Sequence, residues 1–396
     1  MSRSTIHRWR LIVPLAALTA LVCAAAALAA SSHGAAGSTL VVDNSFTLKT
    51  SDPQRAFDPT GSIVDRGIYD TLFTYNKGDL AHAVPLLVSS WKASNGAKTF
   101  TFNLKTNVHF ANGDPLTSAD VVFSLNRLIN LKGNPAFLLT GIVIKPSGKY
   151  RVVMRSQTPA GQLPAILANP STGIVNSKLV KAHGGSASVG GDTKDKAESW
   201  LNSSASVGAG SGPYVLSAYS TTSQVTLKRN PKYWGATKPA FDTIVVRNMV
   251  AATQLINVGR GSHEVAIDLA SDQAQTLKSN SKVKAALQPS TWVFWLFTNN
   301  DPQVSAVTSN KQWQNAIRYG LDYKSILSVA GPGAYQTPGI IPSMFAGALP
   351  AKEAVQQNVA KAKAALQASG QSGQSVTLEY PSDLTINGVP FATLAQ

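Results

Sequence analysis

The sequence predicts a mixed α/β protein built from more than one domain. Its 396 residues exceed what one hydrophobic core usually organises. Short runs rich in β-branched and aromatic residues, such as 225–229 and 243–247, indicate strands, and a capped apolar segment at 118–128 indicates a helix. A hydrophobic fraction of 44% is that of a folded chain, which excludes disorder throughout.

The first thirty residues have the pattern of a secretory signal peptide. Three arginines precede an apolar run at 11–30, and Ala27-Leu28-Ala29 offers the small residues of a cleavage site. The alternative is an uncleaved transmembrane anchor, because about twenty apolar residues can span a bilayer. Cys23, the only cysteine, lies in this run, so the exported part has no disulfide. Val22 precedes it where a lipid-modified cysteine normally follows a small residue.

The exported part is strongly basic. Without Arg3, Arg8 and Arg10 it has 32 basic and 20 acidic residues, a formal charge of +12. Nucleic acid could attract such a surface, but export and the scattered positions of the lysines argue against that partner. We therefore expect a loose affinity for anionic lipid or cell wall.

The first elements follow a flexible linker at 31–38. A strand is expected at 39–42, followed by turns at Asp52-Pro53 and Asp58-Pro59. The apolar spacing then predicts a helix over 62–72. Strands are expected at 85–91 and at 99–104, where apolar and polar residues alternate.

The segment 108–124 carries turn and capping signals. Asn112-Gly113 is typical of a tight turn, and Thr117 with Asp120 forms a capping box that starts a helix running to Leu128. These residues could also contact a ligand, but capping and turning is the interpretation we favour. Further on, the Gly-, Ser- and Ala-rich stretch 181–207 predicts a loose loop.

The stretch 210–247 predicts a hairpin with strands at 215–219 and 225–229, ended by Asn230-Pro231, and a further strand at 243–247. Taken alone, this stretch could have a purely structural role, as half-buried β-structure whose aromatic rings cover one end. A helix from about Val250 to Gly259 and a buried strand at 265–269 come next.

The most aromatic segment, 291–300, predicts a strand with large rings on both faces, because Trp292 and Trp295 cannot point the same way. These rings are either core or one wall of a ligand cleft. An alanine-rich helix is expected at 360–370 and a strand at 376–380.

Several of these segments resemble one family. Gly210-Ser211-Gly212-Pro213-Tyr214, followed by the segment Lys228 to Trp234 that reads KRNPKYW, is similar to the signature of the family 5 extracytoplasmic solute-binding proteins of ABC importers. The segment 108–124, the Tyr69-Asp70-Thr71-Leu72 run and the helical stretch 313–327 resemble further elements of that family.

This resemblance implies an α/β fold of the class II periplasmic-binding-protein type, with two lobes and an extra subdomain in the first. Such receptors normally continue well beyond a strand like 376–380, so we expect a sequence truncated at its C-terminal side, with an incomplete second lobe. The expected divisions are a signal peptide at 1–30, a linker at 31–38, lobe I at 39–74 and 207–290, the subdomain at 75–206, and lobe II at 291–396.

The resemblance also implies a function. The chain would be a monomeric receptor, periplasmic or at the outer face of the cytoplasmic membrane, that closes over a peptide or similar solute and passes it to ABC permease subunits. It would need no cofactor and would not be an enzyme. The residues expected at the ligand are placed at strand ends or on the aromatic strand, namely Asp58, Asp268, Ser271, Trp292 and Trp295.

Two alternatives remain, a secreted hydrolase and a surface interaction protein on the same scaffold. The sequence offers a hydrolase little support, because it contains no G-x-S-x-G nucleophile motif. Its histidines also lack the short spacing of a metal site such as H-E-x-x-H. They occupy positions 7, 33, 82, 109, 183 and 263.

Overall fold

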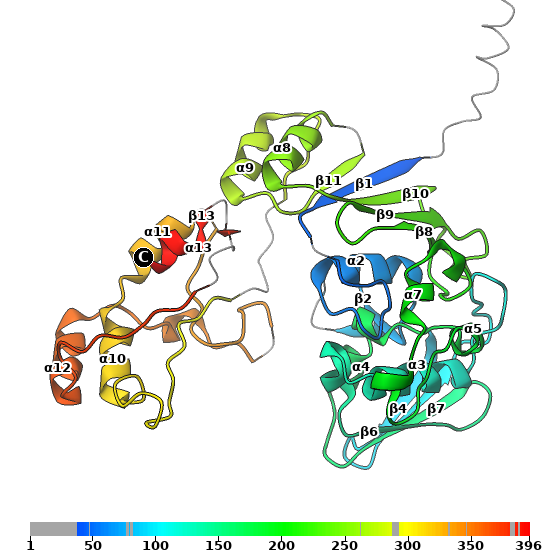
Figure 1. The fold of residues 1–396 in the computed structure, drawn as a ribbon, viewed down its shortest axis with the longest axis horizontal. Helices are drawn as coiled ribbons and strands as arrows, with labels where there is room; N and C mark the ends of the chain where they lie inside the picture. Colours follow the sequence, from blue (N-terminus) through cyan, green and yellow to red (C-terminus); the bar gives the residue numbers. More distant parts are fainter. Residues whose placement is uncertain are drawn as a thin grey trace, which may run out of the picture.

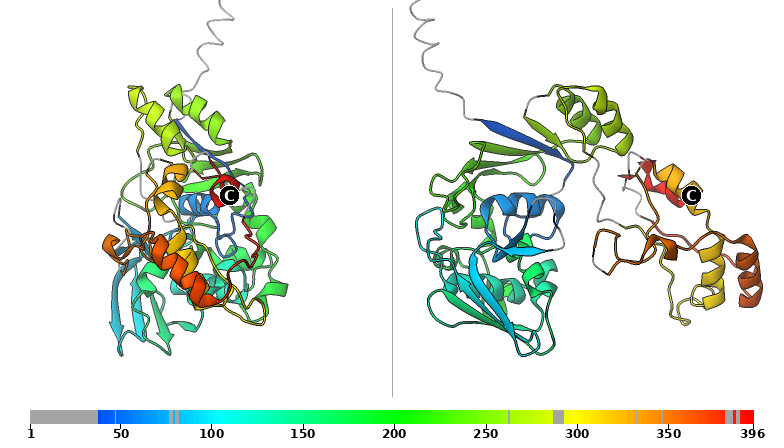
Figure 2. Two further views of the ribbon diagram at one scale, coloured as in Figure 1. Left: turned by 90° about the vertical axis from the view of Figure 1, so that its left-hand side faces the viewer. Right: turned by 180° about the vertical axis from the view of Figure 1, so that it is seen from behind.

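The computed structural model describes residues 38–46, 48–76, 79, 82–261, 263–286, 293–331, 333–345, 347–380, 385–386 and 389–396. Within these ranges the protein contains two larger β-sheets with helices packed on them, and a separate group of helices (Figures 1 and 2). The mixed α/β architecture predicted from the sequence is confirmed. The expected signal peptide lies outside the described residues, and no described helix combines the length and apolar character needed to cross a bilayer.

The first large sheet has five strands in the order β11-β1-β10-β9-β8. Strand β1 lies parallel to both β10 and β11, while β9 runs antiparallel to β8 and β10. The bounds are β1 Thr39–Asn44, β8 Tyr214–Tyr219, β9 Gln224–Arg229, β10 Thr243–Asn248 and β11 Glu264–Ala266. Helix α2 (Pro59–Ile68) packs on it, and Val64 and Ile68 join Val225 and Val246 in one core. The predicted hairpin is therefore confirmed.

The second large sheet has four antiparallel strands in the order β4-β5-β7-β6. Its bounds are β4 Val88–Ser94, β5 Thr99–Leu104, β6 Ile142–Pro146 and β7 Arg151–Ser156. Helix α3 (Ser118–Asn130) covers one face, where Phe100, Phe102 and Met154 pack with Leu125 and Leu128. The alternation predicted for 99–104 is confirmed, because every second residue of β5 is buried.

Shorter elements lie between and after the strands of the two sheets. They are β2 Phe73–Tyr75, β3 Ala83–Pro85, η1 Asn134–Leu139, α4 Leu163–Ile166, η2 Pro170–Thr172, α5 Ser177–Ala182, α6 Gly191–Lys194, α7 Glu198–Leu201, η3 Ser204–Ser206, α8 Ala251–Gly259, α9 Ser271–Thr276 and η4 Leu277–Ser279. The loose loop predicted for 181–207 is wrong, because three of these elements order it and Ala197 and Leu201 are fully buried.

The remaining elements form a group, mostly of helices, that Figure 1 and the right-hand view of Figure 2 show apart from the two sheets. They are α10 Lys311–Gly320, α11 Tyr323–Ala330, η5 Ala351–Glu353, α12 Val359–Ser369, β12 Thr385–Ile386, β13 Val389–Pro390 and α13 Phe391–Ala395. The stretch 313–327 is divided between two helices, because Asp322 caps the second. The helix predicted for 360–370 is confirmed, and Gly370 ends it in the left-handed conformation at φ 65°.

Local capping signals were predicted well. The carboxylate of Asp120 accepts a hydrogen bond from the backbone N–H of Thr117 at 2.9 Å, so the capping box that starts α3 is confirmed. Helix α2 begins earlier than expected, because Asp58 caps it and Pro59 occupies its first position.

Two strand predictions are wrong, and a third is confirmed as a strand but differs in bounds and burial. Residues 293–300 and 376–380 are not strands, and no described strand pairs with either segment. An alternating pattern of side chains does not by itself make a strand, since each strand needs a neighbouring strand for its backbone hydrogen bonds. Strand β11 is shorter than the predicted 265–269 and lies at the sheet edge, where Val265 and Ile267 are 44% and 46% exposed rather than buried.

Candidate functional site

Polar side chains gather where three parallel strands of the five-stranded sheet end. Asn44 ends β1, Asn248 ends β10, and Asp268 follows β11 by two residues. The carboxyl ends of parallel strands form one edge, and α/β proteins commonly bind ligands outside such an edge. We take this edge as the candidate site.

Asn44 connects the parts of this edge. Its side-chain amide donates to Asp268 Oδ1 at 3.1 Å, and its own oxygen accepts from the hydroxyl of Thr60 in the first turn of α2. From α8, Gln254 donates to Asp268 Oδ2 at 2.9 Å and accepts from the Asp268 backbone N–H at 3.1 Å. Asp268 is exposed, and its Oδ1 accepts from Asn44 alone within the described chain. A carboxylate oxygen has room for a second donor, such as a ligand N–H group.

Asp58 lies beside this edge at the start of α2. One carboxylate oxygen accepts from the Gly61 N–H at 2.7 Å, and the other is buried with no hydrogen-bond partner among the described residues. The preceding Phe57 is 44% exposed and packs edge-on against the exposed Phe137, with ring centroids 5.5 Å apart. An accessible aromatic pair therefore adjoins the polar edge.

The other expected site residues are less defined. Trp295 is 47% exposed and packs edge-on against Phe297, with centroids 5.6 Å apart. Ser271 begins α9, but its side chain is outside the described part of the structure, and Trp292 lies outside the described residues altogether.

The structure thus brings two of the five expected residues to one edge, because Thr60 and Asn44 link the neighbourhood of Asp58 to Asp268. No described contact joins Trp295 to them. Sequence reasoning missed Asn44 and Gln254. Asn44 could have been found from its place just beyond the predicted strand 39–42, where a parallel strand presents its carboxyl end.

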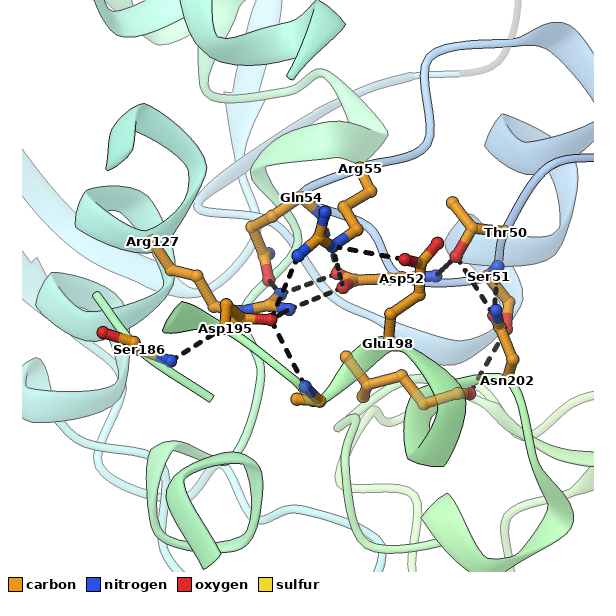
Figure 3. A network of polar contacts seen from close by, with 12 residues as sticks. Thr50, Ser51, Asp52, Gln54, Arg55, Arg127, Ser186, Asp195, Glu198 and Asn202 are labelled. Atoms are coloured by element: carbon orange, nitrogen blue, oxygen red, sulfur yellow. Dashed lines mark hydrogen bonds and ion pairs between the residues drawn. The ribbon is translucent and has the colours of Figure 1, made fainter. Parts of the chain in front are cut away.

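A buried charge network joins α3 to the loop after β1 and to the residue that follows α6 (Figure 3). Arg127 of α3 has a fully buried side chain that donates to both oxygens of Asp52, at 2.7 and 2.6 Å, and to both oxygens of Asp195, at 2.7 and 2.9 Å. It also donates to Gln54 at 2.7 Å. The partly exposed Arg55 reaches Asp52 and Asp195 at 3.4 and 3.3 Å.

This network ties together three distant segments rather than offering a reactive group. Burial alone would lower the pKa of Arg127, but the adjacent charges and hydrogen bonds of Asp52 and Asp195 raise it, so the guanidinium stays charged. Burial works to raise the pKa of Asp195, and the hydrogen bonds from Arg127 outweigh this and lower it. A bidentate pair of this kind fixes geometry.

A second buried carboxylate, Asp70, joins three of the segments that carry the family-like motifs, those around residues 70, 211 and 234. Its Oδ2 accepts from the Ser211 hydroxyl at 2.9 Å and from the Trp234 indole N–H at 2.8 Å. Burial raises the pKa of Asp70, and the two hydrogen bonds and Lys105 oppose that rise. The ammonium of Lys105 lies over the Trp234 ring, 5.1 Å from its centroid. The motifs around residues 70, 211 and 234 are therefore parts of one scaffold.

The glycines of the Gly210-Ser211-Gly212 turn allow this arrangement. A Cβ atom on Gly210 would lie 2.0 Å from the backbone oxygen of Ile68, and one on Gly212 would lie 2.7 Å from the same atom. Only glycine permits so close an approach of two backbones.

We expect Ser211→Ala to lower the free energy of unfolding by about 1 to 3 kcal/mol, because it leaves the buried Asp70 with one hydrogen bond fewer. Urea denaturation followed by circular dichroism measures this. Ser204→Ala, which alters an exposed serine of η3, is the matched control. Equal stability of the two variants would contradict the role given to Ser211.

Among the residues that the structure describes, no group of three or more His, Cys, Asp or Glu side chains is arranged to hold a metal ion. The candidate site is therefore an edge of amide, hydroxyl and carboxylate groups beside aromatic rings, which suits the binding of an organic solute.

The fold is that of a substrate-binding protein. The crystal structure of the ABC transporter substrate-binding protein CtaP (Lmo0135) from Listeria monocytogenes superposes with a TM-score of 0.66 at 20% sequence identity, over 84% of this chain and 65% of that one. Burkholderia pseudomallei OppA superposes with the same TM-score at 19% identity, over 86% and 68% of the two chains.

The chain belongs to family 5 of the bacterial extracellular solute-binding proteins, whose model, described as "family 5 Middle", matches residues 82–396. It is 29% identical over 371 residues to the probable D,D-dipeptide-binding periplasmic protein DdpA of Escherichia coli K12, covering 90% of this chain and 67% of that protein.

It is also 24% identical over 358 residues to the glutathione-binding protein GsiB of Salmonella choleraesuis, covering 87% of this chain and 62% of that one. The chain thus spans about two thirds of the length of these relatives. The resemblance stated from the sequence motifs is confirmed.

Proposed function

We propose that the chain is the extracytoplasmic substrate-binding component of an ABC importer, and that its solute is a peptide or a similar small molecule carrying amide and amine groups. The observation that carries this proposal is the exposed Asp268, held by Asn44 and Gln254 at the carboxyl edge of the parallel strands, with one oxygen able to accept a further hydrogen bond. A carboxylate fixed in this way suits the N–H groups of a peptide.

The names of the relatives support the same chemistry, because D,D-dipeptides and glutathione both present amides and an amine. The exposed rings of Phe57 and Phe137 beside the edge would pack against the apolar part of such a solute. In this proposal Asp58, Ser271 and Trp292 are further candidate contacts.

The remaining parts of the proposal follow from the family. The protein would act as a monomer in the periplasm or at the outer face of the cytoplasmic membrane and deliver its solute unchanged to permease subunits. Its two lobes would be residues 39–290, including the subdomain at 75–206, and residues 291–396. Closure would be driven only by the higher affinity of the solute for the closed state.

A binding panel tests the proposal. Isothermal titration calorimetry with D,D-dipeptides, L,L-dipeptides, glutathione and a free sugar is expected to give affinity for one of the three peptide classes and none for the sugar. Mass spectrometry of the solute after incubation is expected to recover it intact. Conversion of any peptide would instead support the secreted hydrolase, and no binding throughout the panel would reject the peptide assignment.

Trp295→Ala is expected to weaken solute binding about tenfold, which corresponds to 1.4 kcal/mol, because in this proposal the partly exposed ring packs on the solute and its removal loses that contact. Trp91→Ala is the control, since Trp91 is similarly exposed, at 42% against 47%, but lies on β4 of the four-stranded sheet, away from the proposed site. An unchanged affinity of the Trp295 variant would remove this residue from the site.

A further inference from the structure

The net positive charge of the chain is highest in one part of the fold, because acidic residues are scarce there. Residues 82–170 contain nine Lys and Arg but only two acidic residues, Asp114 and Asp120. Both acids are already engaged, Asp120 in the cap of α3 and Asp114 by the side chains of Asn112 and Asn176. They leave the surrounding cations without a nearby counter-charge.

Most of these cations have no acidic partner. Arg127 is buried in its network, Lys132 pairs with Asp192 at 3.0 Å, and Lys105 lies over Trp234. The rest form no ion pair within the described ranges, and they are Lys92, Lys98, Lys145, Lys149, Arg151 and Arg155.

Strand register places four of them on one face of the four-stranded sheet. Lys92 pairs with Thr101, Thr101 with Val153 and Val153 with Lys145, so these residues form a row across all four strands. Arg151 and Arg155 lie two residues either side of Val153 and share its face. We call Lys92, Lys145, Arg151 and Arg155 the basic face.

The basic face points away from the hydrophobic core. The alternate residues of the same strands, among them Phe102, Val152 and Met154, pack against α3 on the opposite face. Helices α3 and α4 lie on the side of the sheet toward the rest of the molecule (Figure 1). All four cations are exposed, and the residues between them are Ser, Thr, Asn and Val.

The shape of the basic face favours a partner with an extended surface over a small ion. Four strands spaced about 4.8 Å apart and six residues long give a surface of roughly 15 by 20 Å. The charges are spread across it rather than gathered around a pocket, which suits an extended anionic surface better than a small anion. Membership of an extracellular family makes nucleic acid the wrong partner, whereas membrane lipid is always close to an importer component.

We propose that the basic face binds an anionic phospholipid surface and so holds the protein against the membrane. Each Lys or Arg near an anionic bilayer strengthens binding about fivefold, and salt screens the attraction. The valines at 143 and 153 and the hydroxyls of Ser94 and Thr101 lie on the same face and would meet the headgroups. This proposal does not depend on the identity of the transported solute.

Vesicle sedimentation with the full chain tests it. Wild type is expected to bind vesicles of phosphatidylcholine with 30% phosphatidylglycerol far better than vesicles of phosphatidylcholine alone, at low ionic strength, and to lose the difference at high ionic strength. Replacing the four basic-face residues by glutamine is expected to reduce the preference for the anionic vesicles at least 30-fold. Residues 1–30, with their three arginines and apolar run, are common to all variants, so the comparison between variants cancels their contribution.

The matched control removes the same charge elsewhere. It carries glutamine at four exposed lysines outside the sheet, namely Lys278, Lys324, Lys352 and Lys363. This variant is expected to keep most of the preference for anionic vesicles. An equal loss in both variants would show attraction by net charge alone and overturn the proposal, as would equal binding of wild type to the two kinds of vesicle.

A local reporter gives an independent readout. A polarity-sensitive fluorophore attached to Thr101→Cys in a Cys23→Ser background is expected to change its emission with anionic vesicles and not with neutral ones. An unchanged emission while the protein sediments with the vesicles would place the contact elsewhere and also overturn the proposal.

Discussion

Arg127→Ala is expected to lower the free energy of unfolding by about 3 to 5 kcal/mol, because it leaves the buried carboxylates of Asp52 and Asp195 without their main counter-charge. Arg55 compensates only in part, since its side chain is 25% exposed and its ion pairs are longer, at 3.3 to 3.4 Å. Most single domains have a total stability of about 5 to 15 kcal/mol. Guanidinium denaturation followed by circular dichroism should therefore show a large fall in the midpoint.

Two further variants make the result specific. Arg155→Ala removes an exposed arginine with no acidic partner in the described structure, and surface changes of this kind usually stay within about 0.5 kcal/mol. Combining Arg127→Met with Asp52→Asn and Asp195→Asn removes the buried charges of this network and is expected to recover part of the lost stability. If Arg127→Ala were no more damaging than Arg155→Ala, the network would not hold the three segments together.

The features that could be predicted from the sequence are those determined by residues close together in the chain. The capping box of Thr117 and Asp120, the glycine that ends α12 and the hairpin before Asn230 are each set within a few residues. Such signals act through local backbone conformation and do not need the rest of the fold. Family resemblance then supplied the global arrangement that these local signals leave open.

The buried network shows what local signals cannot give. Arg127 is 75 residues from Asp52 and 68 from Asp195, so nothing in the sequence indicates that the three side chains meet. The error at 181–207 has the same origin. A Gly-, Ser- and Ala-rich composition suggests a loose loop, but Asp195 anchors this stretch by also accepting from the Ser186 N–H at 2.8 Å.

Only part of the candidate site could be predicted, because it too is built by contacts between residues far apart in the sequence. Asp268 was expected near the end of the predicted strand 265–269, and in the structure it lies two residues beyond β11, at the carboxyl edge. Its partners Asn44 and Gln254 lie 224 and 14 residues away, and only the parallel pairing of β1 with β11 brings Asn44 to the same edge. For 293–300 the sequence shows residues that alternate between two faces. It does not show whether a neighbouring strand is present to accept and donate the backbone hydrogen bonds of a sheet.

A buried carboxylate without a partner provides the second large effect. Asp65 of α2 is 1% exposed, and neither of its oxygens has a hydrogen-bond partner in the described part of the chain. Burial raises the pKa of Asp65 well above its usual value, and the nearby charges of Asp52 and Asp58 raise it further. Tyr69, one turn later in the sequence, also has a buried hydroxyl without a hydrogen-bond partner in this part of the chain.

Asp65→Asn is therefore expected to raise the free energy of unfolding at pH 7 by about 1 to 3 kcal/mol, because the amide stays neutral whereas burial and the nearby carboxylates disfavour the ionised form of Asp65 in the folded protein. The folded pKa lies above the unfolded value of about 3.9. Asp65 thus contributes its full stability only below that value, and the contribution is lost as the pH rises through the folded pKa. The amide of the variant does not ionise, so its advantage should shrink toward pH 4.

Urea denaturation of wild type and Asp65→Asn between pH 4 and pH 8 measures this difference. Asp272→Asn is the control, because Asp272 is an exposed aspartate in α9 and should change stability by less than about 0.5 kcal/mol at any of these pH values. An advantage of Asp65→Asn that is the same at pH 4 and pH 8 would show a packing effect without titration. A variant less stable than wild type at pH 7 would mean that the ionised carboxylate is stabilised in the folded protein, against the burial and like charges that surround it.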